Sequence, residues 1–342
     1  MGAEGGAAGP DRRAVLALLG LGALGAPLLA ACGGDDDRDD DRDDDRDDDR
    51  DDDRDDAGRW PGHRPGRVYL GMAVGGDLEG SLAATGPFGV RRSFFPWDGL
   101  DDEEAVVRED HAADRLPWVS FKPPGGGPGS WAAVASGAHD DDLRERARRY
   151  DALDRPVVVT FHHEPHNDEE GTPEEFAAAW SRVHDVMHDE TGLRGVASVP
   201  ILGEWEFNPR NERGRPEEYL TDDVLERAAF LGVDVYQSRA GAAYDVRLGR
   251  VLDWLDGRGA GHLMLGVGET GATDDYGAPS AVDWWSDSWS WVEGSADRVG
   301  VVSYFNSERN NRQGVRWVLE QSEDLLEGFR SSLRSPVATT LA

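Results

Sequence analysis

Short apolar segments rich in β-branched residues recur along the chain, and each one gives way to a polar stretch containing Gly, Pro, Asn or Asp. Continuous apolar runs of this kind are typical of strands buried on both faces of a parallel sheet. The pattern predicts strands at residues 68–73, 90–95, 117–122, 156–161, 195–202, 233–237, 263–267 and 299–305. Helices are expected between them, at residues 141–153, 173–187, 222–231, 244–257 and 313–333.

Eight strands alternating with helices over roughly 270 residues are expected for an α/β fold of the (β/α)8 TIM barrel type. An open doubly wound sheet is the alternative. It is disfavoured because no Gly-rich phosphate-binding motif follows the first expected strand. We therefore predict one barrel domain at residues 66–334.

The helix after Thr172 has a clear start signal. Thr172 is followed by Pro173 and by Glu175, which predicts a capping box with proline in the first turn. Apolar side chains then follow at spacings of four, three and four residues, which predicts a buried helix face. These side chains are Phe176, Trp180, Val183 and Met187.

The N-terminal residues 1–31 have the pattern of an export signal. Arg12 and Arg13 precede an apolar run that contains Gly and Pro27 and ends in small residues. A membrane span is the alternative, but the run is short and interrupted. Residues 29–32, Leu-Ala-Ala-Cys, are similar to a bacterial lipobox, which implies cleavage before Cys32 and a lipid on its sulfur. We expect an exported protein, anchored by lipid at the extracytoplasmic face of the cell membrane.

Residues 32–65 are expected to form a disordered tether, because residues 35–56 consist of 17 Asp and five Arg with nothing apolar to bury. A calcium-binding repeat is the alternative, but the Gly turns of calcium loops are missing. The whole chain has a formal charge of −32, which argues against nucleic acid as a partner. Cys32 is the only cysteine, so an intrachain disulfide is excluded. We expect a monomer without a cofactor.

Two glutamates stand where barrel enzymes place their chemistry, at the carboxyl ends of expected strands. Glu164 follows the fourth strand within the cluster His162, His163, His166 and Asn167, and Glu269 follows the seventh in an expected tight turn. Two carboxyl groups about 5 Å apart can cleave a glycosidic bond with retention of configuration. Glu164, before Pro165, suits the acid, and Glu269 suits the ionised nucleophile. A capping loop whose polar groups face water is the alternative.

Three histidines within five residues also raise the question of a metal. His162 and His163 point to opposite faces of a strand, so we expect no metal site. For Lys122 the sequence is compatible with two roles, a contact with sugar and a solvated charge on a loop.

Aromatic residues follow several strands and could stack on sugar rings. Trp97, Trp205 and Phe305 are candidates for this role, with packing beneath loops as the alternative. A second group lies further from strand seven and is expected to pack within a helix. This group consists of Trp284, Trp285, Trp289 and Trp291.

These motifs resemble those of family 26 glycoside hydrolases, which are retaining (β/α)8 enzymes. Residues 161–164, Phe-His-His-Glu, are similar to the strand-four motif, and residues 268–271, Gly-Glu-Thr-Gly, to the nucleophile motif. Residues 234–236, Asp-Val-Tyr, resemble the strand-six motif whose Tyr hydrogen-bonds the nucleophile. The resemblance runs from about residue 68 to residue 333 and also includes residues 118–122 and 136–140.

The resemblance implies a mannanase-like endo-glycosidase acting on β-mannan or a related β-glycan. Glu164 and Glu269 would be catalytic, and His163, Asn167, Asp234 and Tyr236 would contact substrate. The chain departs from the family where Pro165 and His166 replace the usual Met-Asn, and where residues 168–170 replace a Trp. A glucan- or xylan-specific enzyme is one alternative, and a surface-anchored carbohydrate-binding protein with little or no turnover is another.

Overall fold

The computed structural model describes residues 60–168, 170–211, 215–307 and 315–342. The expected signal peptide, Cys32 and the acidic repeat lie outside the described residues. Within the described ranges, no helix combines the length and the hydrophobicity needed to cross a membrane.

The described part of the chain forms a parallel barrel, which confirms the predicted (β/α)8 fold. Neighbouring strands pair in the order β5-β4-β3-β2-β1-β9-β8-β7-β6. The strands are β1 (Val68–Ala73), β2 (Val90–Phe95), β3 (Leu116–Phe121), β4 (Val157–Phe161), β5 (Val196–Ser198), β6 (Ile201–Gly203), β7 (Leu231–Tyr236), β8 (Leu265–Gly271) and β9 (Val299–Phe305).

The fifth strand of the barrel is divided into β5 and β6 by Val199 and Pro200. Pro200 has no N–H to donate, so the regular ladder stops there. Hydrogen bonds continue on both sides: the Val199 amide donates to the Val159 carbonyl, and the Gly232 amide donates to the Pro200 carbonyl. This strand therefore closes the barrel between β4 and β7, and β8 is the seventh barrel strand.

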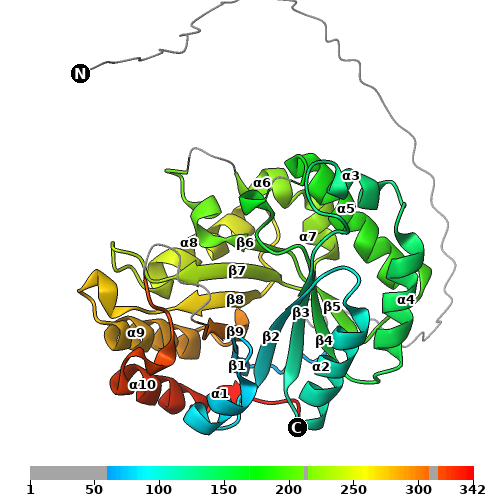
Figure 1. Ribbon diagram of the computed structural model, residues 1–342. Coiled ribbons are helices and arrows are strands. Elements are labelled where there is room, and N and C mark those ends of the chain that lie inside the picture. The colour runs from blue at the N-terminus through cyan, green and yellow to red at the C-terminus, as the bar shows by residue number, and fades with distance from the viewer. Residues whose placement is uncertain (1–59, 169, 212–214, 308–314) are drawn as a thin grey trace, which may run out of the picture. The chain divides into compact units, whose positions relative to one another are not determined.

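The helices lie around the outside of the strands (Figure 1). They are α1 (Leu78–Thr85), α2 (Leu100–Ala112), α3 (Ser130–Ala135), α4 (Asp140–Asp151), α5 (Pro173–His184), α6 (Pro216–Tyr219), α7 (Asp222–Arg227), α8 (Tyr244–Gly257), α9 (Ala281–Gly294) and α10 (Glu323–Leu333). The helix expected at residues 222–231 stops at Arg227 because β7 begins at Leu231. The helix expected from residue 313 begins only at Glu323, where the Ser322 side chain accepts from the Leu325 amide.

The predicted capping box of α5 is confirmed. The Thr172 hydroxyl accepts from the Glu175 amide, and the Glu175 carboxylate accepts from the Thr172 amide. The four apolar side chains on the predicted face of this segment are buried in the core. Trp284, Trp285 and Trp289 are buried on α9, as expected for helix packing.

The packed residues extend beyond the expected limits of 66 and 334. Trp60 is buried, with its ring centroid 5.1 Å from that of Phe230. At the other end, β10 (Ala338–Thr339) pairs with β1. Both chain ends of the described domain therefore contribute to the barrel.

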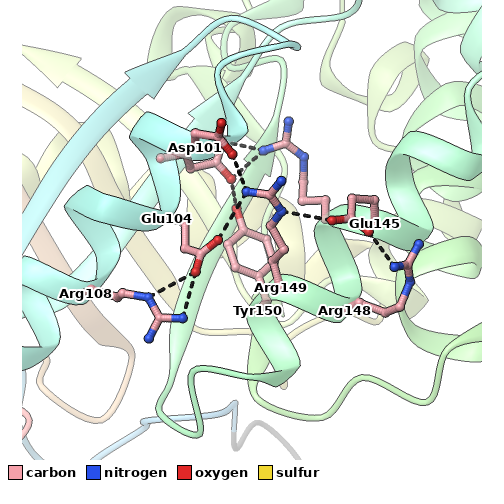
Figure 2. A network of polar contacts seen from close by, with 9 residues as sticks. Asp101, Glu104, Arg108, Glu145, Arg148, Arg149 and Tyr150 are labelled. Carbon is pink, nitrogen blue, oxygen red and sulfur yellow. Dashed lines mark hydrogen bonds and ion pairs between the residues drawn. The ribbon is translucent and has the colours of Figure 1, made fainter.

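A network of ion pairs joins α2 to α4 (Figure 2). Arg149 donates to carboxylates of Asp101, Glu104 and Glu145. On the same helices Glu103, Arg146 and Tyr150 are buried and form a second group, in which Arg146 and Tyr150 donate to the Glu103 carboxylate. Arg146 also donates to the Trp97 carbonyl, with 2.9 Å between the atoms, and so connects this network to the loop after β2.

Two stacked imidazoles at the end of α5 predict a loss of stability in acid. His184 lies 4.4 Å from His188 between ring centroids, and burial together with His188 lowers the pKa of His184 to about 4. The unfolded imidazole titrates near 6.5, so unfolded chains bind this proton first as the pH falls. The neutral His184 therefore contributes its full stabilisation above about pH 6.5. The free energy of unfolding decreases by about 3 kcal/mol as the pH falls from 6.5 to 4.

Urea denaturation between pH 7 and pH 4.5 measures this effect. His184→Gln should reduce the slope of the unfolding free energy against pH by about 1.4 kcal/mol per pH unit. His262→Gln is the matched control, because His262 is exposed. An unchanged slope in His184→Gln would contradict the prediction.

Candidate active site

A cavity of about 700 Å³ lies at the carboxyl ends of the strands and contains both predicted glutamates. Its lining residues are Phe94, His163, Glu164, Asn167, Tyr236, Gln237, Ser238, Arg239, Arg247, Glu269, Tyr276, Phe305 and Trp317. We call it the main cavity. The structure thus brings together six of the residues singled out from the sequence.

A second cavity of about 530 Å³ shares Phe94 and His163 with the main cavity. We call it the adjoining cavity. Trp97 and Lys122 lie on its wall, together with residues of the loop that follows β3. A chain-like ligand crossing from one cavity to the other would therefore pass His163.

Glu269 is held within a strand and not in the tight turn expected from its sequence. β8 continues to Gly271 because Asp234 pairs with Glu269 on one side and Tyr304 with Thr270 on the other, with a shift of register. The Tyr236 hydroxyl donates to Oε2 of Glu269 at 2.8 Å. Burial and the charges of Glu269 and Asp234 raise the pKa of Tyr236 well above its usual value, so this phenol keeps its proton.

Glu164 reaches the main cavity because the chain turns sharply where β4 ends. His162 and Glu164 have φ values of 48° and 49°, in the left-handed region that is costly for residues other than Gly. The Glu164 amide donates to the Ile201 carbonyl at 3.1 Å, which supports the turn. The Asn167 side chain donates to Oε2 of Glu164 at 3.1 Å. Asn167 therefore orients the Glu164 carboxyl group.

Asp234 lies beneath the main cavity and not on its lining, because it is an interior residue of β7 that is only 4% exposed. Burial raises the pKa of Asp234 well above its usual value, and the charges of Glu269 and Glu164 add to this effect. Arg92 on β2 opposes the increase. The Arg92 guanidinium is buried below the cavity floor, where it donates to Ser120 Oγ at 2.8 Å.

The three aromatic candidates lie in different places relative to the two cavities. Phe305 lines the main cavity and Trp97 lines the adjoining one, where its indole donates to Asp142 at 3.0 Å. Trp205 is 50% exposed and lines neither cavity. Sequence reasoning missed Trp317, which lines the main cavity with its ring 5.1 Å from that of Tyr236.

No protein-family profile matches the chain, and no curated protein sequence is significantly similar to it. Solved structures do match. A modular endo-β-1,4-mannanase from Cellulomonas fimi is 16% identical over 81% of this chain and 73% of that protein, with a TM-score of 0.59. Fungal β-1,4-galactanases are 15% identical over 78% of this chain and 99% of theirs, with a TM-score of 0.58.

A third similar structure is GH26C from a Muricauda species. It is 13% identical over 80% of this chain and 87% of that protein, with a TM-score of 0.56. The Cellulomonas enzyme is one of the glycoside hydrolase family 26 mannanases. The chain therefore has the (β/α)8 fold of the family 26 glycoside hydrolases.

Proposed function

We propose that this protein is a retaining glycoside hydrolase that cleaves a β-linked polysaccharide. One observation carries the proposal: the carboxyl groups of Glu164 and Glu269 reach the same cavity from β4 and β8. Two carboxyl groups that face one sugar are the minimum equipment for double displacement at an anomeric carbon.

Each glutamate has a distinct role in this mechanism. The Glu269 carboxylate attacks the anomeric carbon, and Glu164 gives its proton to the departing oxygen. Water then replaces Glu269 at the same carbon, and Glu164 takes the proton of that water. The hydrogen bond from Tyr236 favours the ionised form of Glu269 that attack requires.

The substrate in this proposal is β-mannan or a related β-glycan, cleaved within the chain. Aromatic faces from Phe94, Phe305 and Trp97 suit stacking on neutral sugar rings along the two cavities. The similar structures from Cellulomonas and from fungi are described as a β-1,4-mannanase and β-1,4-galactanases, which supports a β-glycan substrate.

A substrate screen tests the proposal. The purified protein is incubated with mannan, galactan, xylan and mixed-linkage glucan, and new reducing ends are measured against the Glu269→Gln variant. We expect one polymer to be cleaved by the wild type alone. Binding of a polymer with equal, negligible release by both proteins would instead indicate a carbohydrate-binding protein.

We further propose that the protein is exported and held on the membrane by a lipid on Cys32, from the Leu-Ala-Ala-Cys motif. In a bacterial host that processes lipoproteins, Cys32→Ser should leave the precursor unprocessed or release the protein from the membrane fraction. Ala31→Gly, which keeps a small residue before the cysteine, is the matched control. Unchanged fractionation and N-terminal mass in Cys32→Ser would refute anchoring.

A further inference from the structure

Lys122 stands apart in this chain. Of the 36 lysine and arginine residues it is the only lysine, and it follows directly after β3. Its side chain is 45% exposed and lines the adjoining cavity beside His163. An ammonium group is a compact charge with three rotatable donors, whereas a guanidinium is a planar fork. The only lysine of the sequence therefore lies on the wall of the adjoining cavity.

A series of hydrogen bonds connects Trp131 on α3 to the ammonium group of Lys122. The Trp131 indole donates to Nδ1 of His162 at 2.8 Å, and Nε2 of His162 lies 2.7 Å from Oδ2 of Asp168. An indole can only donate, so Nδ1 is the acceptor and the ring proton is on Nε2. His162 therefore donates to Asp168, and the Lys122 ammonium donates to the same oxygen.

The burial and charge of these groups hold the series of hydrogen bonds in one arrangement. Trp131 and His162 are 1% and 0% exposed. Burial lowers the pKa of His162, so the ring stays neutral with its tautomer set by Trp131. Burial alone would raise the pKa of Asp168, but hydrogen bonds from His162 and Lys122 lower it. Asp168 thus remains an anion that fixes one donor of the ammonium group.

His162, Asp168 and Glu170 also have ligand atoms within 4.8 Å of one another, the spacing of a metal site. Both ring nitrogens of His162 are already engaged, however, one as an acceptor and one as a donor. This arrangement favours a positioning role over metal ligation.

We propose that Lys122 contacts substrate in the adjoining cavity and that Trp131, His162 and Asp168 are positioning residues that hold its ammonium there. Asp168 takes one of three donors, which leaves two for sugar hydroxyl groups. Asp168 compensates the positive charge of Lys122, and Asp98 adds a negative charge to the wall of the same cavity. The adjoining cavity should therefore bind a neutral sugar in preference to a uronate. The inference rests on the proposed glycosidase function for the identity of the ligand.

Kinetics on polysaccharide and oligosaccharides test the contact. Lys122→Met should raise KM roughly tenfold or more with little change in kcat, because a hydrogen bond to a charged donor is lost. Lys122→Arg should not restore KM, and Asp168→Asn should raise it by a smaller factor. His162→Leu should act like Asp168→Asn, whereas His162→Gln, whose amide can accept from Trp131 and donate to Asp168, should retain most of the wild-type KM. If His162→Leu does not fold, the partly exposed Asp168 supplies the test.

Amine chemistry gives a readout that does not depend on turnover. In the Glu269→Gln background, trinitrobenzenesulfonate should label Lys122 and the N-terminal amine, which mass spectrometry places on different peptides. A neutral oligosaccharide of the cleaved polymer should slow labelling of Lys122 several-fold, and a uronate-bearing oligosaccharide should not. Asp168→Asn should speed labelling because the amine is released from its ion pair with the carboxylate.

The outcomes separate the two proposals. Normal hydrolysis with labelling unaffected by saturating substrate would overturn the role of Lys122 and leave the glycosidase standing. A lack of both hydrolysis and protection with every polymer would overturn the two proposals together. Equal protection by neutral and acidic oligosaccharides would refute the selection of neutral sugars.

Discussion

Replacing Glu269 with alanine is expected to abolish polysaccharide cleavage and to let azide form an α-configured glycosyl azide. The side chain that forms the covalent intermediate is absent, and the small anion enters the space it leaves below the anomeric carbon. One inversion replaces two, so the product changes configuration. NMR of the product formed from an activated β-glycoside of the cleaved sugar distinguishes the two anomers.

Glu164→Ala should behave differently on the same activated substrate. A good leaving group needs no proton, so the first step survives while release of the intermediate slows. Azide then attacks the intermediate and gives a β-configured product. On polysaccharide, whose leaving group does need a proton, the loss should be roughly a hundred- to ten-thousand-fold.

The pH dependence and a control variant also test this assignment. The wild-type rate should follow a bell-shaped curve against pH, with its acidic limb from Glu269 and its basic limb from Glu164. Asp287→Ala, at an exposed site on α9, is the control and should resemble wild type. Equal losses in both glutamate variants on activated substrate, without azide rescue in either, would remove the division of roles. Full activity in either would remove the mechanism.

Strands that are buried on both faces could be predicted closely from the sequence. β1, β2 and β9 have the predicted bounds, and β4 differs by one residue at its start. β1, β4 and β9 are short, mostly apolar or β-branched runs that are buried and end at a polar loop, so pattern and environment agree. β2 contains Arg91, Arg92 and Ser93, and its last three residues are only partly buried or exposed. The same logic put Glu164 at a strand end, because a strand of fixed direction has only one carboxyl end.

Among the helices that the structure describes, α1, α2, α3 and the four-residue α6 were not predicted, for physical reasons that the structure makes plain. α2 packs with a face that includes Glu103, Asp110 and His111, so its buried side carries no apolar periodicity. Asp110 is satisfied by Arg91 and Arg115 from outside the helix, a pairing that no local pattern reveals. α1 contains Gly80 and few large apolar residues, and α3 is only six residues long.

The candidate site was predicted in part for a related reason. Residues at strand ends follow from topology, whereas loop residues reach the cavity only through tertiary packing. Tyr276 and Trp317 lie far apart in sequence, yet their rings are 5.9 Å apart on the cavity wall. Arg92 carried a weak signal, a charged residue inside an apolar strand, whose meaning depends on Asp234 across the barrel.

The buried group formed by Glu103, Arg146 and Tyr150 should dominate the stability of the α2–α4 face. Glu103→Gln is expected to lower the free energy of unfolding by about 3 to 5 kcal/mol, since it leaves the Arg146 charge buried without its anion. Arg146 cannot turn to water, because the residue is only 2% exposed and its guanidinium carbon lies 4.0 Å from the centre of the Phe121 ring. Urea denaturation of the variant and the wild type measures the difference.

Glu104→Gln is the matched control, because Glu104 is the next residue of the same helix and belongs to the partly exposed ion-pair network of Arg149 in Figure 2. Exposed ion pairs contribute about 1 kcal/mol or less, so this variant should stay close to wild type. The double variant Glu103→Leu with Arg146→Met should recover much of the loss, because removing both charges leaves neither unpaired. Equal losses for Glu103→Gln and Glu104→Gln would show that burial does not set the strength of this pair. Arg146 also holds the carbonyl of Trp97, so the double variant should bind oligosaccharide more weakly even where its stability returns.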